Sequence, residues 1–352
     1  MAGGIEFSSS CIMNAMIERG HNVSLITWDE ADPEPFFALS PLVNWTCLDL
    51  GNPHEKATLH MKVKRFLKLR RLIKESGADV VCAFHDSCYS AAILASVGLG
   101  VPVIAAERSA LSRYDHKIGG TGRLKLFVVL ALAARITVFF ERYRHDYPSF
   151  LRDRITPIPN MVFMPDRLSE HGEKENIVLY VGRLSYEKNP HVMLKAFARL
   201  PEEGEWRLKI AGGGPEDGNL KELAKSLCIE GRVEFLGPVK DVGALYDDAS
   251  VFCFPSRWEG FGNALAEAMA HGLACVGFAE TSGARDLIVH EKTGLLAAGN
   301  DNVDGLYGAL KQLIDSRELR VRLGEGASQQ ARHFSPDNVF DAWECVFKDV
   351  AL

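Results

Sequence analysis

The stretch Ser256-Arg-Trp-Glu-Gly-Phe-Gly-Asn-Ala-Leu-Ala-Glu-Ala-Met-Ala-His-Gly272 predicts a turn that leads into a helix. The apolar run 251–254 before it is typical of a buried strand, which Pro255 ends. Two glycines within the stretch predict a tight turn, and Asn263 is expected to cap a helix that the final glycine stops. A strand, a glycine turn and a helix in this order present backbone N–H groups and a positive helix end to an anion.

Two carboxylates flank this turn, Glu259 before it and Glu267 one turn into the helix. A carboxylate beside a bound phosphate is unfavourable unless the ligand also offers hydroxyl groups, which donate strong hydrogen bonds to an ionised Glu. The alternative is that Glu267 closes a capping box. With Asn263 as the cap, however, the box position is Ala266, so the register is one residue off. We therefore interpret both glutamates as residues that bind ligand hydroxyls.

The composition is that of a globular protein without a strong charge bias. The chain has 352 residues, of which 47% are hydrophobic and 24% charged, with a net charge of −6. This length suits two domains, and the negative charge gives no reason to expect a nucleic-acid partner. Eight scattered cysteines without a Cys-x-x-Cys pair indicate a reducing compartment, which favours the cytoplasm. The absence of any Asp-x-Asp motif removes the simplest carboxylate clamp for a metal-bound nucleotide.

The start of the chain predicts a parallel α/β domain that lacks a strand. A helical pattern covers 8–19 and a strand pattern covers 22–27, and the pair Gly3-Gly4 precedes both. Such a glycine pair normally follows a strand. We expect either that the sequence begins after that strand or that the domain does without it, and we favour the first interpretation.

Polar residues follow two predicted strands of the first half. The strand 79–84 ends at His85-Asp86-Ser87, and the strand 101–106 ends at Glu107-Arg108-Ser109. Polar groups at the carboxyl ends of parallel strands point to where open α/β sheets bind ligands. A lone histidine is more often a structural hydrogen-bonding group, so both roles stay open for His85 at this point.

A cationic helix is predicted at 57–76, with seven cations and no acid between Lys62 and Lys74. One interpretation is a solvated helix face. The other is contact with an anionic membrane surface or a lipid diphosphate, because apolar residues accompany the cations. The cations that we assign to acceptor or membrane contact are Lys62, Lys64, Arg65, Lys68, Arg71 and Arg108.

The second half predicts a parallel sheet covered by helices on both faces, because strand and helix patterns alternate throughout it. The chain is thus expected to form two doubly wound domains that face a central cleft. Their predicted bounds are 1–164 and 177–335, with a polar linker at 165–176 and a final helix at 336–352.

Two further stretches of the second half suit a phosphate ligand. Gly182-Arg183 ends a strand and Lys188 follows within five residues, which predicts a cationic clamp for a diphosphate, with surface salt bridges as the alternative. The triple glycine 212–214 predicts a turn where backbone can approach a ligand, although a triple glycine alone is weak evidence.

Together these stretches resemble the retaining, nucleotide-sugar-dependent glycosyltransferases of family 4, which have the GT-B fold. The resemblance is highly specific over 177–298 and weaker over the first half. The matching segments are Gly182-Arg183, Glu187-Lys188-Asn189, 210–215, 235–237, 255–263, 267–272 and 293–296, with Gly3-Gly4, 18–23 and His85 in the first half.

The resemblance implies a role for each matching residue. Arg183 and Lys188 would neutralise the leaving diphosphate, Glu259 and His85 would contact the donor sugar, and Glu267 would bind the ribose. It implies donor contacts also for Gly3, Gly4, Gly182, Gly213, Gly237, Gly260, Phe261, Gly262, Asn263 and Ala264. It further implies a metal-independent reaction without a cofactor, and a final helix that crosses back to the first domain.

The expected function is transfer of a hexose or N-acetylhexosamine from a nucleotide diphosphate sugar, with UDP favoured over GDP. The acceptor would be a glycan or a polyprenyl-diphosphate-linked saccharide in polysaccharide or lipopolysaccharide synthesis. The protein would then work at the cytoplasmic face of the membrane as a peripheral protein. The alternatives are a GT-B-like protein that binds nucleotide sugars without turnover, and a sugar-nucleotide epimerase.

Overall fold

The chain divides into two compact units. The first unit comprises Met1–Asn160 and Asp337–Leu352, and the second comprises Met161–Pro336. The first boundary thus lies shortly before residue 164, where the sequence predicts the first domain to end. Most of the linker predicted at 165–176 lies outside the described residues. The computed structural model describes residues 3–30, 34–51, 57–111, 119–166, 174–202 and 205–351.

The strands of the first unit are short and parallel. Four of them form one sheet in the order β3 (Val81–Phe84), β4 (Val103–Ala106), β5 (Arg135–Val138) and β6 (Ile155–Pro157). The other two, β1 (Ser24–Thr27) and β2 (Asn44–Cys47), form a separate parallel pair. Among the described residues, no strand joins this pair to β3.

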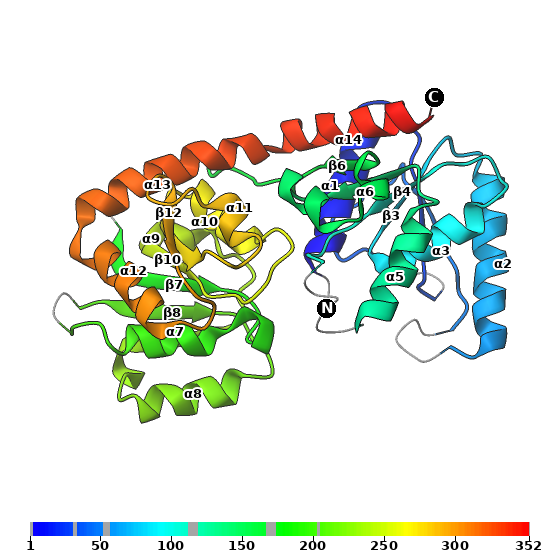
Figure 1. The fold of residues 1–352 in the computed structure, drawn as a ribbon. Helices are drawn as coiled ribbons and strands as arrows, with labels where there is room; N and C mark the ends of the chain where they lie inside the picture. Colours follow the sequence, from blue (N-terminus) through cyan, green and yellow to red (C-terminus); the bar gives the residue numbers. More distant parts are fainter. Residues whose placement is uncertain are drawn as a thin grey trace. The chain divides into compact units, whose positions relative to one another are not determined.

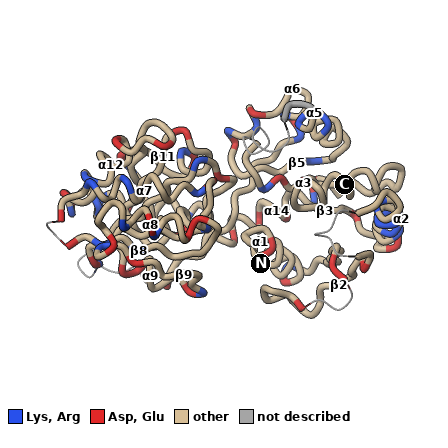
Figure 2. The backbone as a smooth tube through the Cα atoms, turned by 90° about the horizontal axis from the view of Figure 1, so that it is seen from below, with Lys and Arg blue, Asp and Glu red and all other residues tan. Residues whose placement is uncertain are grey.

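Helix α3 (Asp86–Ser96) lies at the centre of a helical layer in the first unit (Figure 1). It packs against β3 and β4, and it also packs against α2 (Leu59–Ser76) and α5 (Gly119–Leu130). Lys and Arg residues gather along α2 (Figure 2). Across the described ranges, no helix combines the length and the apolar character that a membrane span requires. The unit also contains η1 (Glu141–Asp146) and α6 (Ser149–Arg152).

The first helix begins earlier than the sequence pattern predicts. Helix α1 (Gly4–Glu18) starts immediately after Gly3, whereas the pattern places its start near residue 8. The Gly3 N–H donates to Glu6 Oε2 at 2.9 Å, which occupies one of the N–H groups that a helix start leaves without a partner. The glycine pair is therefore the beginning of a helix rather than a separate turn.

The C-terminal helix α14 (Pro336–Ala351) is anchored in the first unit. Trp343 is 1% exposed, and its ring lies 5.6 Å from the Phe84 ring and 5.0 Å from the Arg108 guanidinium. At the edge of this contact, Arg19 pairs with Asp341 at 2.7 Å and with Glu344 at 2.8 Å. An apolar centre with a charged rim thus holds the helix.

The second unit contains one six-stranded parallel sheet. Strands β10 and β11 are buried along their whole length, as expected for a parallel sheet that is covered on both faces. The sequence pattern predicts strands at 177–182, 206–211, 233–236, 251–254 and 274–278, so β12 is the strand of this sheet that it does not indicate. The order is β12 (Gly294–Ala297), β11 (Ala274–Phe278), β10 (Ala249–Phe254), β7 (Glu175–Val181), β8 (Arg207–Ala211) and β9 (Val233–Gly237).

Helices cover both faces of this sheet (Figure 1). Helix α12 (Val303–Asp315) packs against α7 (Pro190–Phe197), and α10 (Asn263–Ala270) packs against α13 (Arg317–Ala331). The prediction of parallel α/β structure in both halves is therefore confirmed. The remaining helices are η2 (Tyr186–Lys188), α8 (Asp217–Ser226), η3 (Glu230–Arg232), α9 (Gly243–Asp248), α11 (Ala284–Leu287) and η4 (Arg332–Phe334).

Replacing the buried indole should loosen α14. Trp343→Ala should lower the free energy of unfolding of the first unit by about 3–5 kcal/mol, because it removes a fully packed ring and leaves a cavity. The measurement is urea unfolding followed by circular dichroism. Cys345→Ala on the exposed side of the same helix is the control, and it should change stability by less than about 0.5 kcal/mol. Equal midpoints for the two variants would contradict this account of the anchor.

Candidate functional site

The candidate site of the second unit lies where its strand order reverses. Chain order runs outward from β7 to β8 and β9, and it then returns to β10 on the other side of β7. The loops that follow β7 and β10 leave the same edge of the sheet side by side, because these two strands are parallel neighbours. Ligands of open α/β sheets bind at such a switch point. The loop 182–189 follows β7, and the loop 255–262 follows β10.

A lysine and a glutamate from these two loops form an ion pair. Lys188 Nζ donates to Glu259 Oε1, and the same oxygen accepts a hydrogen bond from Ser256 Oγ at 3.0 Å. Both side chains are mostly buried. The structure thus brings together the predicted phosphate cation and the predicted sugar carboxylate, which lie 71 positions apart in the sequence.

Arg183 lies in the same loop as Lys188 and is exposed. Burial alone would raise the pKa of Glu187, but its backbone hydrogen bond and Ser185 lower it, and the charges of Lys188 and Arg183 lower it further. Both predicted cations therefore lie close to one carboxylate of the loop. The end of β7 thus carries two cations, one of which, Lys188, is paired with Glu259.

A second group of residues fixes the turn that carries Lys188. The Arg257 guanidinium binds the Tyr186 carbonyl, stacks 4.0 Å from the Tyr186 ring, and pairs with Asp301 at 2.9 Å. Asp301 also accepts a hydrogen bond from Asn189 Nδ2 at 2.5 Å. Three loops are thereby tied together around Lys188. The sequence assigns no role to Arg257, Asn189 or Asp301, although the first two lie in matching segments, because their shared contact is not visible in any local pattern.

The glycines around the β7 loop allow backbone segments to pack closely against each other. A Cβ on Gly212 would lie 1.9 Å from the Gly182 carbonyl oxygen, and a Cβ on Gly214 would lie 2.2 Å from the Leu184 carbonyl oxygen. A Cβ on Gly213 would be 3.3 Å from the Pro238 ring, which is far less severe. The positions that require glycine are thus the two neighbours of the predicted donor contact Gly213. The predicted contact Gly237 has a φ of 66°, a backbone conformation that favours glycine.

The start of α10 differs by one residue from the prediction. Gly262 is the N-cap with a φ of 95°, and Asn263 is the first helical residue, so the expectation that Asn263 caps the helix is wrong. A left-handed cap favours glycine, whereas a Cβ there would press on Phe254 at 3.2 Å. The predicted residues Gly260, Phe261, Gly262, Asn263 and Ala264 form the loop and first turn at this helix end.

The second carboxylate, Glu267, is held by a tyrosine. Tyr246 Oη donates to Glu267 Oε2 at 3.0 Å, and the Tyr246 ring is 1% exposed. Burial raises the pKa of Glu267, and the hydrogen bond from Tyr246 opposes this by lowering it. Glu267 takes no part in a capping box, because its partner is a side chain of α9.

The loop after β11 forms hydrogen bonds to the backbone of the loop after β10. Thr281 Oγ1 donates to the Ser256 carbonyl at 2.6 Å, and Ser282 Oγ donates to the Glu259 carbonyl at 2.8 Å. Gly283 follows, where a Cβ would lie 2.8 Å from the Phe261 carbonyl oxygen. The sequence signal for this support was the run Thr281-Ser282-Gly283 after a buried strand, which the sequence reading did not single out.

This part of the second unit therefore offers cations, carboxylates and a helix N-terminus at one sheet edge. Cations and backbone N–H groups bind phosphate oxygens, and carboxylates accept hydrogen bonds from ligand hydroxyls. The chemistry suits an anion that also carries hydroxyl groups. Within the described ranges, no three His, Cys, Asp or Glu side chains are grouped so that they could hold a metal ion.

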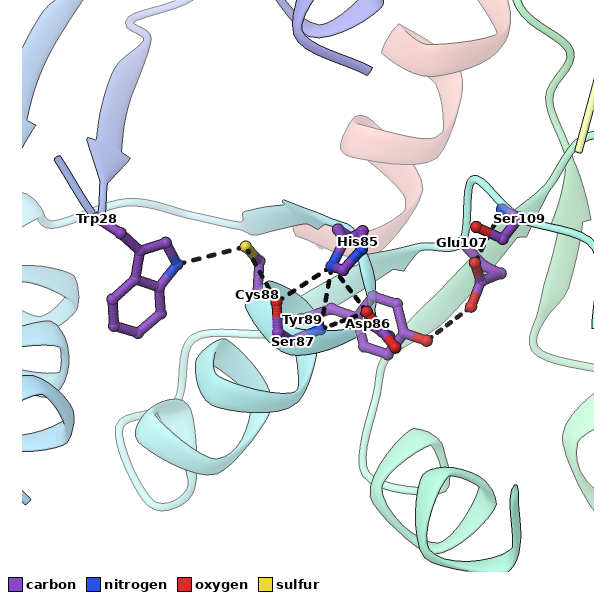
Figure 3. Close-up of polar contacts among 8 residues, drawn as sticks. All are labelled: Trp28, His85, Asp86, Ser87, Cys88, Tyr89, Glu107 and Ser109. Atoms are coloured by element: carbon purple, nitrogen blue, oxygen red, sulfur yellow. Dashed lines mark hydrogen bonds and ion pairs between the residues drawn. The ribbon is translucent and has the colours of Figure 1, made fainter. Parts of the chain in front are cut away.

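The other predicted donor contacts, His85, Gly3 and Gly4, belong to the first unit. His85 follows β3, has a φ of 75°, and accepts the helix-capping hydrogen bond from the Ser87 N–H (Figure 3). Its Nδ1 lies 2.7 Å from Asp86 Oδ1. The structural role that the sequence left open for His85 is thus present, and its donor contact stays a prediction. Gly3 and Gly4 lie at the start of α1.

Next to His85, a buried glutamate holds the loop after β4. Tyr89 Oη donates to Glu107 Oε2 at 2.7 Å, and the Ser109 N–H donates to Glu107 Oε1 at 2.9 Å (Figure 3). Glu107 is only 2% exposed. This carboxylate therefore fixes the path of the chain beyond β4.

Arg108 does not have the surface role that the sequence suggested. It is 7% exposed, donates to the Ile158 carbonyl at 2.9 Å and to Thr137 Oγ1 at 2.5 Å, and stacks against Trp343. Burial lowers its pKa to about 10, so it stays charged at neutral pH. Its place under α14 makes it part of the helix anchor rather than an acceptor or membrane contact.

Three of the predicted α2 cations also have partners within the unit. Lys68 Nζ donates to the Leu48 carbonyl at 2.6 Å, and Arg65 donates to the Leu50 carbonyl at 3.0 Å. Arg71 pairs with Glu75 at 2.7 Å on the exposed side. Lys62 and Lys64 are exposed, and neither forms an ion pair with a described residue. Of the α2 cations predicted to contact an acceptor or membrane, Lys62 and Lys64 thus have the charge that can reach an external partner.

Comparison with known proteins gives consistent matches. A family model described as "Glycosyl transferases group 1" matches residues 166–330. The chain is 31% identical to the Campylobacter jejuni "GalNAc-alpha-(1->4)-GalNAc-alpha-(1->3)-diNAcBac-PP-undecaprenol alpha-1,4-N-acetyl-D-galactosaminyltransferase", with 99% of this chain and 96% of that protein covered. It is also 31% identical to the Erwinia amylovora "Amylovoran biosynthesis glycosyltransferase AmsD", with 98% and 96% covered.

Comparison with a solved structure shows that the fold is shared as well. The chain is similar to Anabaena HepE in complex with UDP and glucose, with a TM-score of 0.78 and 18% identity. The match covers 99% of this chain and 96% of that one. The likeness thus includes both units.

Weakening the contacts of Asp301 should loosen the turn that carries Lys188. Asp301→Asn removes the charge that pairs with Arg257, and Asn tolerates the local φ of 66°. Amide hydrogen exchange over 186–188 should rise about three- to tenfold, because a partly exposed charged hydrogen bond contributes roughly 1 kcal/mol. Mass spectrometry of deuterium uptake measures this change.

The matched control is Asp304→Asn. It removes the exposed ion pair with Arg199 on the same unit and should leave exchange over 186–188 unchanged. If both variants raise exchange equally, Asp301 does not hold this turn specifically.

Proposed function

Because the chain belongs to the group 1 glycosyl transferases, we propose that it moves a hexose or N-acetylhexosamine from a nucleotide diphosphate sugar to a glycan acceptor in cell-surface glycan synthesis. The GT-B fold expected from the sequence is confirmed. The observation that carries the site assignment is the contact between Lys188 and Glu259 at the switch point of the second unit.

The acceptor that we propose is a polyprenyl-diphosphate-linked saccharide. The name of the Campylobacter relative, which this chain matches over nearly its whole length, includes a PP-undecaprenol glycan. The amylovoran relative supports polysaccharide synthesis in the same way. Since a polyprenyl chain resides in a bilayer, we propose a peripheral location at the cytoplasmic face of the membrane.

UDP is the nucleotide that we propose for the donor. The support is the shared fold with HepE, whose structure contains UDP and glucose. In this proposal, Arg183, Lys188 and the start of α10 bind the diphosphate and stabilise its charge as the glycosidic bond breaks. The reaction then needs neither a metal ion nor a cofactor to neutralise the leaving group.

The ion pair suggests which contacts change when the donor binds. Lys188 forms an ion pair with Glu259, which balances its charge. A diphosphate carries more negative charge than one carboxylate, so it would draw Lys188 away and leave Glu259 to accept hydrogen bonds from sugar hydroxyls. We propose that Glu259 acts as this acceptor, with His85 as a further sugar contact.

We propose a retaining reaction in which the acceptor hydroxyl attacks from the face that the diphosphate leaves. The acceptor oxygen forms a bond to the anomeric carbon while the bond to the phosphate oxygen breaks, and the departing phosphate oxygen takes the acceptor proton. Lys188 and Arg183 stabilise the charge on that phosphate throughout. No covalent intermediate on Glu259 is required.

Loss of the lysine should reduce transfer. Lys188→Ala should lower the transfer rate about 10²–10³-fold, because it removes a charge that stabilises the leaving diphosphate. The measurement is transfer of radiolabelled sugar from UDP-GalNAc and UDP-GlcNAc to a polyprenyl-diphosphate-linked saccharide, with a parallel reaction that lacks acceptor. Transfer that needs the acceptor supports this function, whereas epimerised donor without acceptor would contradict it.

Lys195→Ala is the matched control for this change. It removes an exposed lysine from α7 of the same unit and should leave the transfer rate unchanged. A Lys188→Ala variant with normal rate and normal donor affinity would show that the cation assignment is wrong.

Thermal unfolding in the presence of UDP-, GDP- and ADP-sugars identifies the base of the donor, because a ligand that binds the native state raises the Tm of the protein.

Donor affinity should depend on pH through Glu267. Its ionised form accepts hydrogen bonds from Tyr246 and a ribose hydroxyl more strongly than the protonated acid does, and burial raises its pKa. Affinity should therefore fall as the pH decreases, and this fall should begin at a higher pH than for an ordinary Glu. Tyr246→Phe should move the fall to still higher pH, because it removes a hydrogen bond that lowers the pKa.

Calorimetric Kd values for UDP from about pH 4 to pH 8 measure this dependence. Glu267→Gln should bind UDP more weakly and with a flatter pH profile. A wild-type profile that stays flat down to pH 4 would rule out Glu267 as an ionised ribose acceptor.

A further inference from the structure

The helical layer of the first unit exposes an unusual number of aliphatic side chains. Helix α3 packs against both α2 and α5, so the three helices form one layer beside the sheet (Figure 1). Eight Leu and Val side chains of this layer are between 45 and 79% exposed. They are Leu59, Val63 and Leu67 on α2, Leu94 and Val97 at the end of α3, and Leu124, Val128 and Leu132 on α5 and the turn after it.

The α5 residues show that this exposure is systematic. Leu124, Val128 and Leu132 are spaced by four residues, which places them on one side of a helix. The opposite side is formed by Phe127 and Leu130, which are buried. Helix α5 is thus apolar toward the core and also toward the outside, whereas a surface helix normally turns a polar face to water.

Lys and Arg residues accompany these apolar residues on α2 and α5 (Figure 2). Helix α2 carries seven Lys and Arg residues and one acid, in a chain whose net charge is −6. Lys62, Lys64 and Lys74 are exposed, and Lys125 adds an exposed cation on α5. Among the described residues, these four lysines form no ion pairs. Their charge is therefore available to an external partner.

We infer that the outward face of α2, α3 and α5 docks on an anionic lipid bilayer, and we name it the docking face. The inference rests on the proposed function and specifies the surface that brings the enzyme to its lipid-linked acceptor. A bilayer offers phosphate groups to the lysines and acyl chains to the leucines and valines at the same time. Nucleic acid would satisfy only the lysines, and a second copy would place two cationic faces against each other.

The arrangement also gives the two kinds of residue different tasks. The α2 lysines attract the protein to anionic headgroups from a distance of about a Debye length. The aliphatic residues then contribute by entering the boundary between headgroups and acyl chains. Charge sets the preference for anionic lipid, and the apolar residues set how strongly the protein stays bound.

Co-sedimentation with vesicles tests both tasks. Wild-type protein should bind vesicles of equal parts phosphatidylcholine and phosphatidylglycerol, and should bind pure phosphatidylcholine far more weakly. The triple variant Lys62→Gln, Lys64→Gln, Lys74→Gln should lose about 100-fold in affinity for the anionic vesicles, because each lysine near such a surface contributes about 1 kcal/mol. The triple variant Leu124→Ser, Val128→Ser, Leu132→Ser should lose at least about tenfold for both vesicle types.

A matched control carries the same change in charge on the second unit. Lys195→Gln, Lys240→Gln, Lys292→Gln removes three exposed lysines there and should bind vesicles like the wild type. Circular dichroism shows that each variant is folded, and UDP binding shows that the proposed diphosphate site of the second unit is intact. Equal loss of vesicle binding in the control and the α2 variant would overturn the docking face.

Further outcomes separate the docking face from the proposed function. Transfer to lipid-linked acceptor without any vesicle binding by the wild type would overturn the docking face and leave the function standing. Vesicle binding that follows the pattern above, without transfer, would support the docking face and contradict the function. Binding to duplex DNA as tight as to anionic vesicles, or a dimer that the aliphatic variant converts to a monomer, would overturn the bilayer as the partner.

Discussion

The ion pair between Lys188 and Glu259 is the interaction on which the candidate site depends. It joins the loops after β7 and β10, two parallel neighbours on either side of the point where strand order reverses. Each group limits the penalty of burying the other, since a buried charge without a partner is strongly unfavourable. The pair therefore holds a cation and a carboxylate next to each other, as the proposed nucleotide-sugar donor requires.

Around this pair, hydrogen bonds, ion pairs and close backbone packing hold the loops in place. Asp301 and Arg257 hold the turn before Lys188, and Ser282 binds the backbone at Glu259. Glycines at 212 and 214 let the next loop pack directly on the backbone at 182–184. A site supported in this way is held in one geometry before ligand arrives, which reduces the ordering that binding requires.

The first unit contains charged residues both in its interior and on its surface. Arg108 and Glu107 are both nearly inaccessible, and each forms hydrogen bonds within the unit. The exposed face of α2, α3 and α5 is by contrast rich in lysine, leucine and valine. Inner charges thus fix the sheet and α14, whereas outer charges remain available to a partner. A buried cation beside aromatic rings thus stabilises the unit, whereas exposed cations beside aliphatic side chains can contact a partner.

The sequence by itself determined the parallel α/β class, most strands of the second unit, and the loops that carry Arg183, Lys188, Glu259 and Glu267. It could do so because buried strands, glycine turns and helix starts leave local patterns. It misplaced the cap of α10 and the role of Arg108, since burial and backbone angles depend on distant neighbours. Only the tertiary structure decided that Lys188 pairs with Glu259, that Tyr246 holds Glu267, and that Asp301 fixes the turn. Those contacts join residues far apart in the chain, and no local pattern encodes which distant side chains meet.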